Sequence, residues 1–114
     1  MNIDLSYLED ITGGDKEMMI EMLDLFIEDI PEQISLIKTH ASEKNLSKLG
    51  SETHKLKPTL QYVGLFEMFE IIKELEESAK SGVYSEEINS LANKVSEYSK
   101  EAIPLLHNKR KELS

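Results

Sequence analysis

Cysteine is missing from the 114-residue sequence, and proline and glycine are scarce, with three and five copies. The absence of cysteine excludes a disulfide framework, Cys-ligated zinc, iron–sulfur clusters and thiol nucleophiles. Long hydrophobic runs are also missing, because no apolar stretch approaches the roughly 20 residues that span a bilayer. The first ten residues carry acidic but no basic side chains, which is unlike a targeting segment. We therefore expect a cytoplasmic protein with no membrane partner.

Positive charge is in short supply, because 13 Lys and Arg residues against 22 Asp and Glu residues give a formal net charge of −9. This balance repels phosphate backbones, so nucleic acid is not an expected partner. A content of 39% hydrophobic and 31% charged residues is typical of a soluble, folded helical domain. The length predicts one domain over residues 1–114, and together with the opening Met1 it favours a free-standing protein, which we expect to be a monomer.

The few breaks in the chain outline a set of helices. Asp15, which follows the turn Gly13-Gly14, and Asn45 can each cap a helix. Pro31 either kinks one long helix or separates two helices that lie end to end. A short segment at 3–11 could cover one end, and the apolar spacing predicts longer helices over residues 15–41, 46–63, 65–81 and 86–106. Because the connections are short, we predict an all-α, antiparallel up-and-down four-helix bundle with a short N-terminal capping helix.

His54 is predicted to point into solvent from the helix over residues 46–63. The apolar residues of that helix form one stripe, and His54 lies roughly 125° from the centre of the stripe at about 100° per residue. On the same face, Gly50 costs the helix about 1 kcal/mol, and the imidazole leans over it, which leaves space for another molecule. Lys57 adds a cation within reach of a phosphoryl group on the ring.

Each of these residues also has an ordinary structural interpretation. His54 could be a surface histidine without a role, Gly50 could allow close helix packing, and Lys57 could be a solvated charge. Pro58 either bends the helix at this site or marks the end of the helix. The combination of an outward His54 with Gly50 and Lys57 favours a functional site.

The run from Thr53 to Leu65 resembles the signature of the histidine-containing phosphotransfer (Hpt) domain family. The positions that match the signature are His54, Leu56, Lys57, Val63 and Gly64. The segments 13–26, 30–31 and 75–76 are similar to other helices of that family. One position departs from the pattern, because the family usually has glycine after the lysine and this chain has Pro58.

The resemblance implies a histidine phosphocarrier of a two-component phosphorelay. His54 would accept a phosphoryl group from the aspartyl phosphate of a receiver domain and pass it to another receiver, with Lys57 stabilising charge. A neutral imidazole, with a reference pKa of about 6.5, is a competent nucleophile at neutral pH. A carrier of this kind is not an enzyme, and the sequence has no Gly-rich nucleotide-binding loop or Walker pattern.

The same resemblance implies which molecules the carrier meets. The expected partners are response-regulator receiver domains and a hybrid sensor histidine kinase. The expected docking face for a receiver consists of Gly50, Ser51, Pro58, Gln61 and Phe66. The chain should need no cofactor and no metal of its own, since the family leaves Mg²⁺ to the receiver.

Two other classes of function compete with this interpretation. An enzyme needs converging acids, bases or metal ligands, and the histidines at 40, 54 and 107 lie on different predicted segments. A helical interaction module that is not phosphorylated is the stronger alternative. Its apolar docking surface could be formed by Met18, Met19, Met22, Phe66 and Phe69. Such residues are typical of a core, except Phe66, which lies off the apolar stripe of its helix. The basic run at 109–111 is typical of a helix C-terminus.

Overall fold

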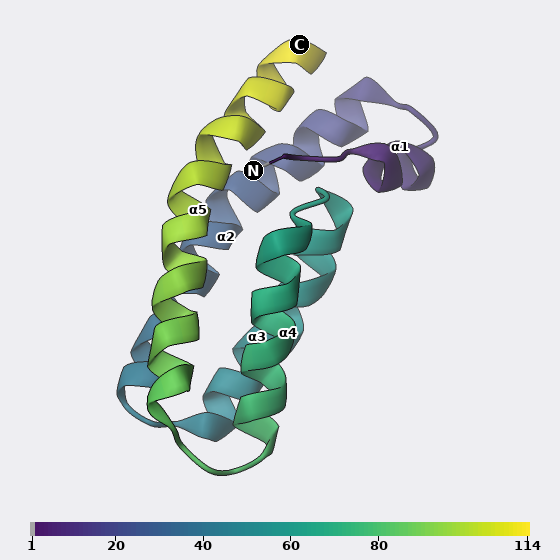
Figure 1. Cartoon of the computed structure of the whole chain (residues 1–114). Coiled ribbons are helices and arrows are strands. Elements are labelled where there is room, and N and C mark those ends of the chain that lie inside the picture. Colours follow the sequence, from purple (N-terminus) through teal and green to yellow (C-terminus); the bar gives the residue numbers. More distant parts are fainter. Residues whose placement is uncertain (1) are drawn as a thin grey trace.

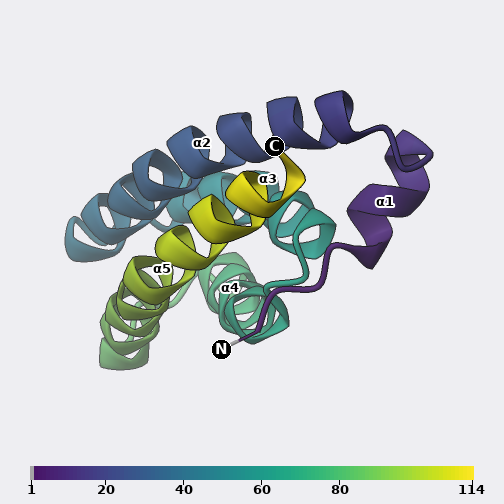
Figure 2. The same cartoon turned by 90° about the horizontal axis from the view of Figure 1, so that it is seen from above.

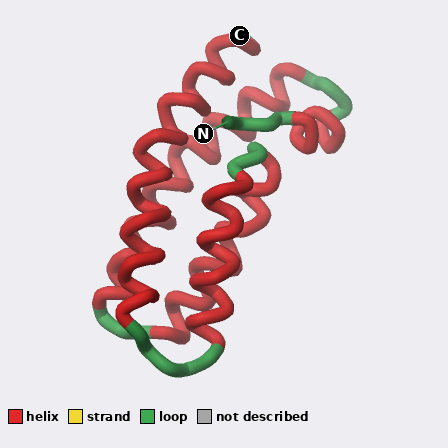
Figure 3. The backbone as a smooth tube through the Cα atoms, viewed as in Figure 1, coloured by secondary structure: helices red, strands yellow, loops and turns green. Residues whose placement is uncertain are grey.

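The structure is a computed structural model, and it describes residues 2–114. The described chain is helical and contains five helices joined by short loops (Figures 1 and 3). The helices are α1 (Ser6–Thr12), α2 (Lys16–Ser42), α3 (Leu46–Tyr62), α4 (Phe66–Lys80) and α5 (Glu86–Leu113). Met1, which entered the expectation of a free-standing protein, lies outside the described residues. None of the described helices is long and apolar enough to cross a membrane.

The helix starts follow the predicted capping residues. The side chain of Asp15 accepts a hydrogen bond from the Met18 N–H at 3.1 Å, and Asn45 accepts one from the Lys48 N–H at 3.2 Å. These carboxylate and amide oxygens satisfy N–H groups that have no partner within the helix. The predicted boundaries are therefore correct to within one or two residues for most of the chain, with α5 extending to Leu113.

The prolines lie inside helices and do not end them. Pro31 lies within α2, so the alternative of two helices end to end is wrong. Pro58 lies within α3, which continues to Tyr62, so the alternative that it marks the helix end is also wrong. α5 continues through Pro104 as well. Flanking helical turns, packed on the core, keep each helix going although the proline removes one backbone donor.

The four long helices form the predicted bundle, with consecutive helices antiparallel (Figures 1 and 2). α3 packs most extensively on α4, and α2 packs most extensively on α5. Their apolar stripes meet in one core that runs along the bundle. Among the fully buried residues are Leu23, Ile30, Leu49, Leu56, Leu60, Met68, Ile72, Leu75, Val95 and Leu106. The antiparallel pair α3 and α4 brings the middle of one helix beside the second half of the other.

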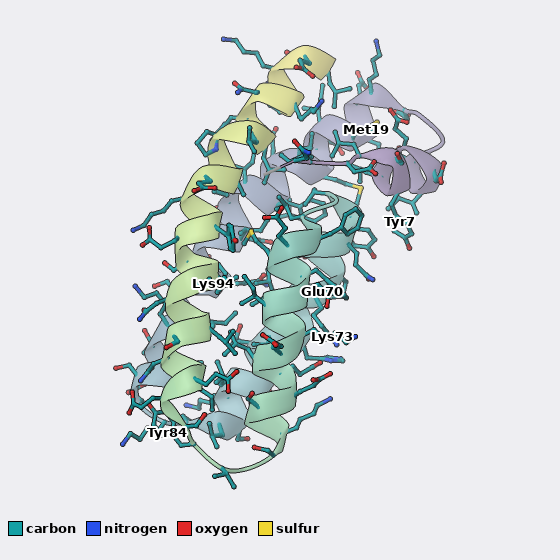
Figure 4. All side chains as sticks on the ribbon, viewed as in Figure 1. Tyr7, Met19, Glu70, Lys73, Tyr84 and Lys94 are labelled. Atoms are coloured by element: carbon teal, nitrogen blue, oxygen red, sulfur yellow. The ribbon has the colours of Figure 1, made fainter. Side chains whose placement is uncertain are left out.

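Helix α1 lies across one end of the bundle, as the prediction of a capping segment requires (Figures 1 and 2). Its Leu8 is fully buried. Tyr7 projects from α1 on the side toward the bundle (Figure 4) and stacks on Tyr62 of α3, with ring centroids 5.4 Å apart. Tyr62 in turn stacks on Phe26 of α2 at 5.9 Å. This row of three rings ties α1 to the end of α3 and, through Tyr62, to α2.

Gly64 allows the chain to pass from α3 to α4 beside the N-terminal segment. Its φ is +67°, and an added Cβ would lie 2.3 Å from the backbone oxygen of Asp4. The Asp4 N–H donates to the Val63 oxygen at 3.3 Å. Only glycine fits this close approach in the left-handed region.

The burial of the predicted apolar residues has exceptions. Met18 is 48% exposed, so its assignment to the core stripe of α2 is wrong, whereas the adjacent Met19 is buried. The first turn of α2 contacts the bundle only along a narrow stripe, and Met18 lies beside that stripe. Met22, Phe69 and Tyr98 are partly buried against the core.

Candidate functional site

His54 projects from the middle of α3 into solvent, as predicted. Its side chain is 73% exposed, while Thr53 before it and Leu56 after it in the sequence are fully buried. The Thr53 hydroxyl donates to the Gly50 oxygen at 2.9 Å, so this polar group is satisfied within the helix. The buried neighbours fix the rotation of α3 and thereby the direction of the imidazole.

A carboxylate of α4 holds one nitrogen of this ring. Nδ1 of His54 lies 2.8 Å from Oε2 of Glu76. Oε1 of Glu76 lies 2.5 Å from Nζ of Lys57, and Nζ of Lys80 lies 3.9 Å from Oε2. Glu76 itself is only 4% exposed. One buried carboxylate therefore gathers an imidazole and two ammonium groups from α3 and α4.

The environment of Glu76 determines its charge. Burial raises the pKa of this carboxyl, but hydrogen bonds from Lys57 and His54 and the charges of Lys57 and Lys80 outweigh it, so that the pKa lies below its usual value. Glu76 is therefore ionised at neutral pH and can only accept hydrogen bonds. Nδ1 of His54 must then carry a proton and donate a hydrogen bond to Oε2. In a neutral ring this leaves Nε2 with its lone pair available.

Lys57 is a partly buried partner of Glu76 and not a solvated charge. Its side chain is 25% exposed and its ammonium is turned toward α4. The alternative interpretation of Lys57 from the sequence is thus wrong. Its place within one turn of His54 is as predicted.

The surroundings of Gly50 are compatible with both interpretations considered for it. A Cβ at this position would meet the Cβ of Ala79 at 3.7 Å, so α3 and α4 approach closely here. Gly50 also lines a hollow of about 420 Å³ beside the imidazole. The hollow is bounded by Leu46, Ser47, Gly50, Ser51, His54, Glu76, Ala79 and Lys80.

The remaining residues of the predicted docking face do not all lie together. Ser51, Pro58 and Gln61 are exposed on α3 and flank His54 along the helix. Phe66 is 56% exposed, but it lies at the start of α4 and lines a different hollow, with Asn2 and Gly64. The structure therefore separates Phe66 from the hollow at Gly50 by more than two turns of α4.

Glu76 is the site residue that the sequence interpretation missed. The sequence contained a signal for it, because Glu76 falls in the buried stripe of α4 with Ile72, Leu75 and Ala79. A glutamate among core positions is rarely buried without a charged partner. Which partner it has could not be derived, because this depends on how α3 and α4 align.

A comparison with protein families decides the classification. The family described as Hpt domain matches residues 21–101 of the chain. The chain belongs to the Hpt domain family. This Hpt domain is thus a phosphotransfer module of two-component signalling, and Hpt domains are phosphocarriers rather than enzymes.

The fold of this Hpt domain is also that of a solved structure. It is similar to the crystal structure of the HPT domain from a sensor hybrid histidine kinase of Shewanella, with a TM-score of 0.83 and 17% identity. The match covers 98% of this chain and 96% of that one. No curated protein matches the chain by sequence. The predicted fold class is confirmed.

Proposed function

We propose that this Hpt domain carries a phosphoryl group on Nε2 of His54, taking it from the aspartyl phosphate of one receiver domain and passing it to another. The observation that carries the proposal is the contact between Nδ1 and Glu76, 2.8 Å long, on an otherwise exposed ring. A carboxylate that fixes the proton on Nδ1 leaves Nε2 as the nucleophile and points it outward. A partner can reach that atom without any movement of the bundle.

The transfer needs no proton donor or acceptor other than this pair. As Nε2 attacks phosphorus, the Nε2–P bond forms, the bond from phosphorus to the receiver's aspartate breaks, and a carboxylate leaves. The ring becomes an imidazolium that keeps its Nδ1 proton, and Glu76 stabilises the positive charge. Passing the phosphoryl group on reverses these changes and returns a neutral ring.

Lys57 stabilises charge at the site through its bond to Glu76, which keeps the carboxylate ionised. Gly50, Ser51, Pro58 and Gln61 surround the approach to the ring, and Phe66 extends the docking face toward the start of α4. Mg²⁺ chemistry belongs to the receiver, which supplies the acidic phosphorylation site. We take the carrier to be a cytoplasmic monomer that meets receiver domains and a hybrid sensor histidine kinase.

Replacement of His54 tests this proposal. His54→Gln should accept no phosphate from a phosphorylated receiver. Its melting temperature should stay close to that of the unaltered protein, because the side chain is exposed and a glutamine amide can still donate a hydrogen bond to Glu76. The matched control is His107→Gln, an exposed histidine on α5. Incorporation of radiolabelled phosphate and a thermal melt would be measured on both variants. Labelling of His54→Gln at the normal rate contradicts the proposal.

A further inference from the structure

Lys80 lies beside the imidazole in the last turn of α4. Its Nζ is 3.9 Å from Oε2 of Glu76, the oxygen that Nδ1 of His54 also contacts at 2.8 Å. Lys57 is bound to the other oxygen, Oε1. Lys80 and the imidazole therefore share one oxygen of the carboxylate, and Lys57 binds the other.

The two lysines differ in how easily they can leave Glu76. Lys57 is bound at 2.5 Å and is 25% exposed, whereas Lys80 is at 3.9 Å and is 69% exposed. Moving Lys57 away would strip a buried carboxylate of its closest cation, which is strongly unfavourable. Moving Lys80 costs little, because its ammonium lies 3.9 Å from the carboxylate and its side chain is exposed, so water can replace Glu76 around it. Lys80 is the cation that can turn toward a new anion.

The hollow beside His54 offers such an anion a set of donors. Lys80 lines this hollow together with Ser47, Ser51 and Gly50. Both serines are exposed, and they precede His54 by seven and three residues, which places them on the imidazole's side of α3. Gly50, which lies four residues before His54, adds no side chain to this hollow. An ammonium and hydroxyl groups are the side-chain donors that suit phosphoryl oxygens.

We propose that Lys80 and Ser51 hold the phosphoryl group on His54 in the interval between two transfers, while Lys57 remains with Glu76. This inference rests on the proposed function of His54. Lys80 is then a phosphoryl-binding residue, and the hollow over Gly50 is where the phosphoryl oxygens lie. The role of Lys57 is to position Glu76.

The balance of charge supports this division of roles. A phosphoryl group brings about two negative charges to the site at neutral pH. Glu76 adds one more, and the phosphorylated imidazolium and Lys57 together offset two of the three. Lys80 supplies the charge that brings the sum to neutral, and no other lysine contacts Glu76 among residues 2–114.

A cation in this place should slow the loss of phosphate to water. In hydrolysis, water attacks phosphorus, the Nε2–P bond breaks, its electron pair returns to the ring, and inorganic phosphate leaves. The transition state is loose, so the phosphoryl oxygens carry less negative charge than in the phosphohistidine. An ammonium on these oxygens therefore stabilises the phosphohistidine more than the transition state, which lengthens its lifetime.

The test uses phosphoramidate as the donor, so that no receiver is involved. Its P–N bond breaks as the Nε2–P bond forms, and ammonia leaves. After the donor is removed, the phosphohistidine signal is followed by ³¹P NMR at constant pH in the full chain, in Lys80→Gln, in Lys80→Arg and in Ser51→Ala. Lys100→Gln is the matched control, because Lys100 is 68% exposed and pairs with Glu97 of its own helix.

The half-life should be about fivefold shorter in Lys80→Gln, on the scale of one exposed ion pair, and shorter to a smaller extent in Ser51→Ala. Lys80→Arg and Lys100→Gln should keep the normal half-life. An unchanged half-life in Lys80→Gln, or an equal loss in Lys100→Gln, overturns the inference. Because loading is chemical, these outcomes are separate from a failure of receivers to phosphorylate His54, which contradicts the proposed function instead.

Discussion

Two groups of charged side chains join neighbouring helices of this bundle, and they differ in how far water reaches them. Glu76 is buried between α3 and α4 and contacts His54, Lys57 and Lys80. Asp24 of α2 and Arg110 of α5 form a two-pronged pair, with distances of 2.8 and 3.3 Å, in which both side chains are exposed. Each group links segments that are far apart in the sequence.

Burial decides which of the two groups fixes the geometry of its helices. An exposed pair can exchange its partner for water at almost no cost, so its side chains are held only loosely. A buried carboxylate cannot do so, and the two partners that bind it most closely, Lys57 and the imidazole of His54, must stay in place. The buried Glu76 therefore fixes the position of the imidazole, while the pair of Asp24 and Arg110 lies on the surface of the contact between α2 and α5 and does not fix its geometry. Substitutions at Gly50, Lys57 and Arg110 test this contrast.

The largest effect on phosphotransfer is expected from a substitution at Gly50, which lines the same hollow as His54 and Glu76. Gly50→Leu should leave a folded, helical protein whose phosphotransfer from a receiver falls steeply, because the new side chain fills the hollow beside His54. Stopped-flow transfer and a thermal melt on the same variant would measure both properties. Loading by phosphoramidate should fall less than transfer from a receiver, because that donor is small.

Gly50→Ala is the matched control for this substitution. Its Cβ would meet Ala79 at an ordinary contact distance of 3.7 Å, so it should fit. Helix propensity alone should then raise stability by up to about 1 kcal/mol. Unfolding of Gly50→Leu would show that the contact with α4 outweighs the open hollow, and the steric account of the site would be wrong.

A smaller effect is expected on removing the closest partner of Glu76. Lys57→Met should slow transfer without blocking it, and it should lower stability at neutral pH by about 1–3 kcal/mol, since a buried carboxylate loses a charged hydrogen bond. Lys55→Met is the control, because Lys55 is exposed on the same helix and pairs with Glu52. Denaturant unfolding of the two variants gives the comparison.

The pH dependence of this difference follows from the pKa of Glu76, which is lowered in the folded protein. A lowered pKa contributes stability that is present above the ordinary glutamate value of about 4.3 and is lost as the pH falls through the lowered value. Burial raises the pKa of Glu76, and Lys57 is one of the groups that lower it. In Lys57→Met this pKa should therefore be lowered less. The stability difference should therefore be largest above about pH 5 and shrink toward pH 3. A difference that is constant with pH would assign the loss to packing of the lysine stem.

Most of the fold could be predicted from the sequence because its signals are local. Asp15 and Asn45 cap the helices that they precede, and these caps depend on neighbours three residues away. The apolar stripe of α3 likewise predicts the outward direction of His54. Pro58 left two possibilities, since a local rule gives the cost of a proline but not the packing of the turns around it.

The candidate site could be predicted only in part, because it depends on how two helices align. His54 and Lys57 share one helix face, and their spacing places them together. Glu76 lies 22 residues beyond His54, and only the packing of α3 on α4 brings them within 2.8 Å. The same alignment places Lys80 at the imidazole and leaves Phe66 at another hollow. Helical periodicity describes each face and contains no information on this offset.

The smallest effect is expected for the exposed group. Arg110→Ala should lower the melting temperature by less than Lys57→Met does, and it should leave phosphotransfer unchanged, because the pair lies on α2 and α5, away from His54. Hydrogen bonding to Arg110 lowers the pKa of Asp24, so the small contribution of the pair should also fade as the pH drops through that value. Melts at low salt and at about 1 M NaCl, where charges are screened beyond about 3 Å, would separate charge from packing. If the difference between Arg110→Ala and the unaltered protein persists at high salt and exceeds that of Lys57→Met, exposure does not decide which charged group fixes the geometry of this bundle.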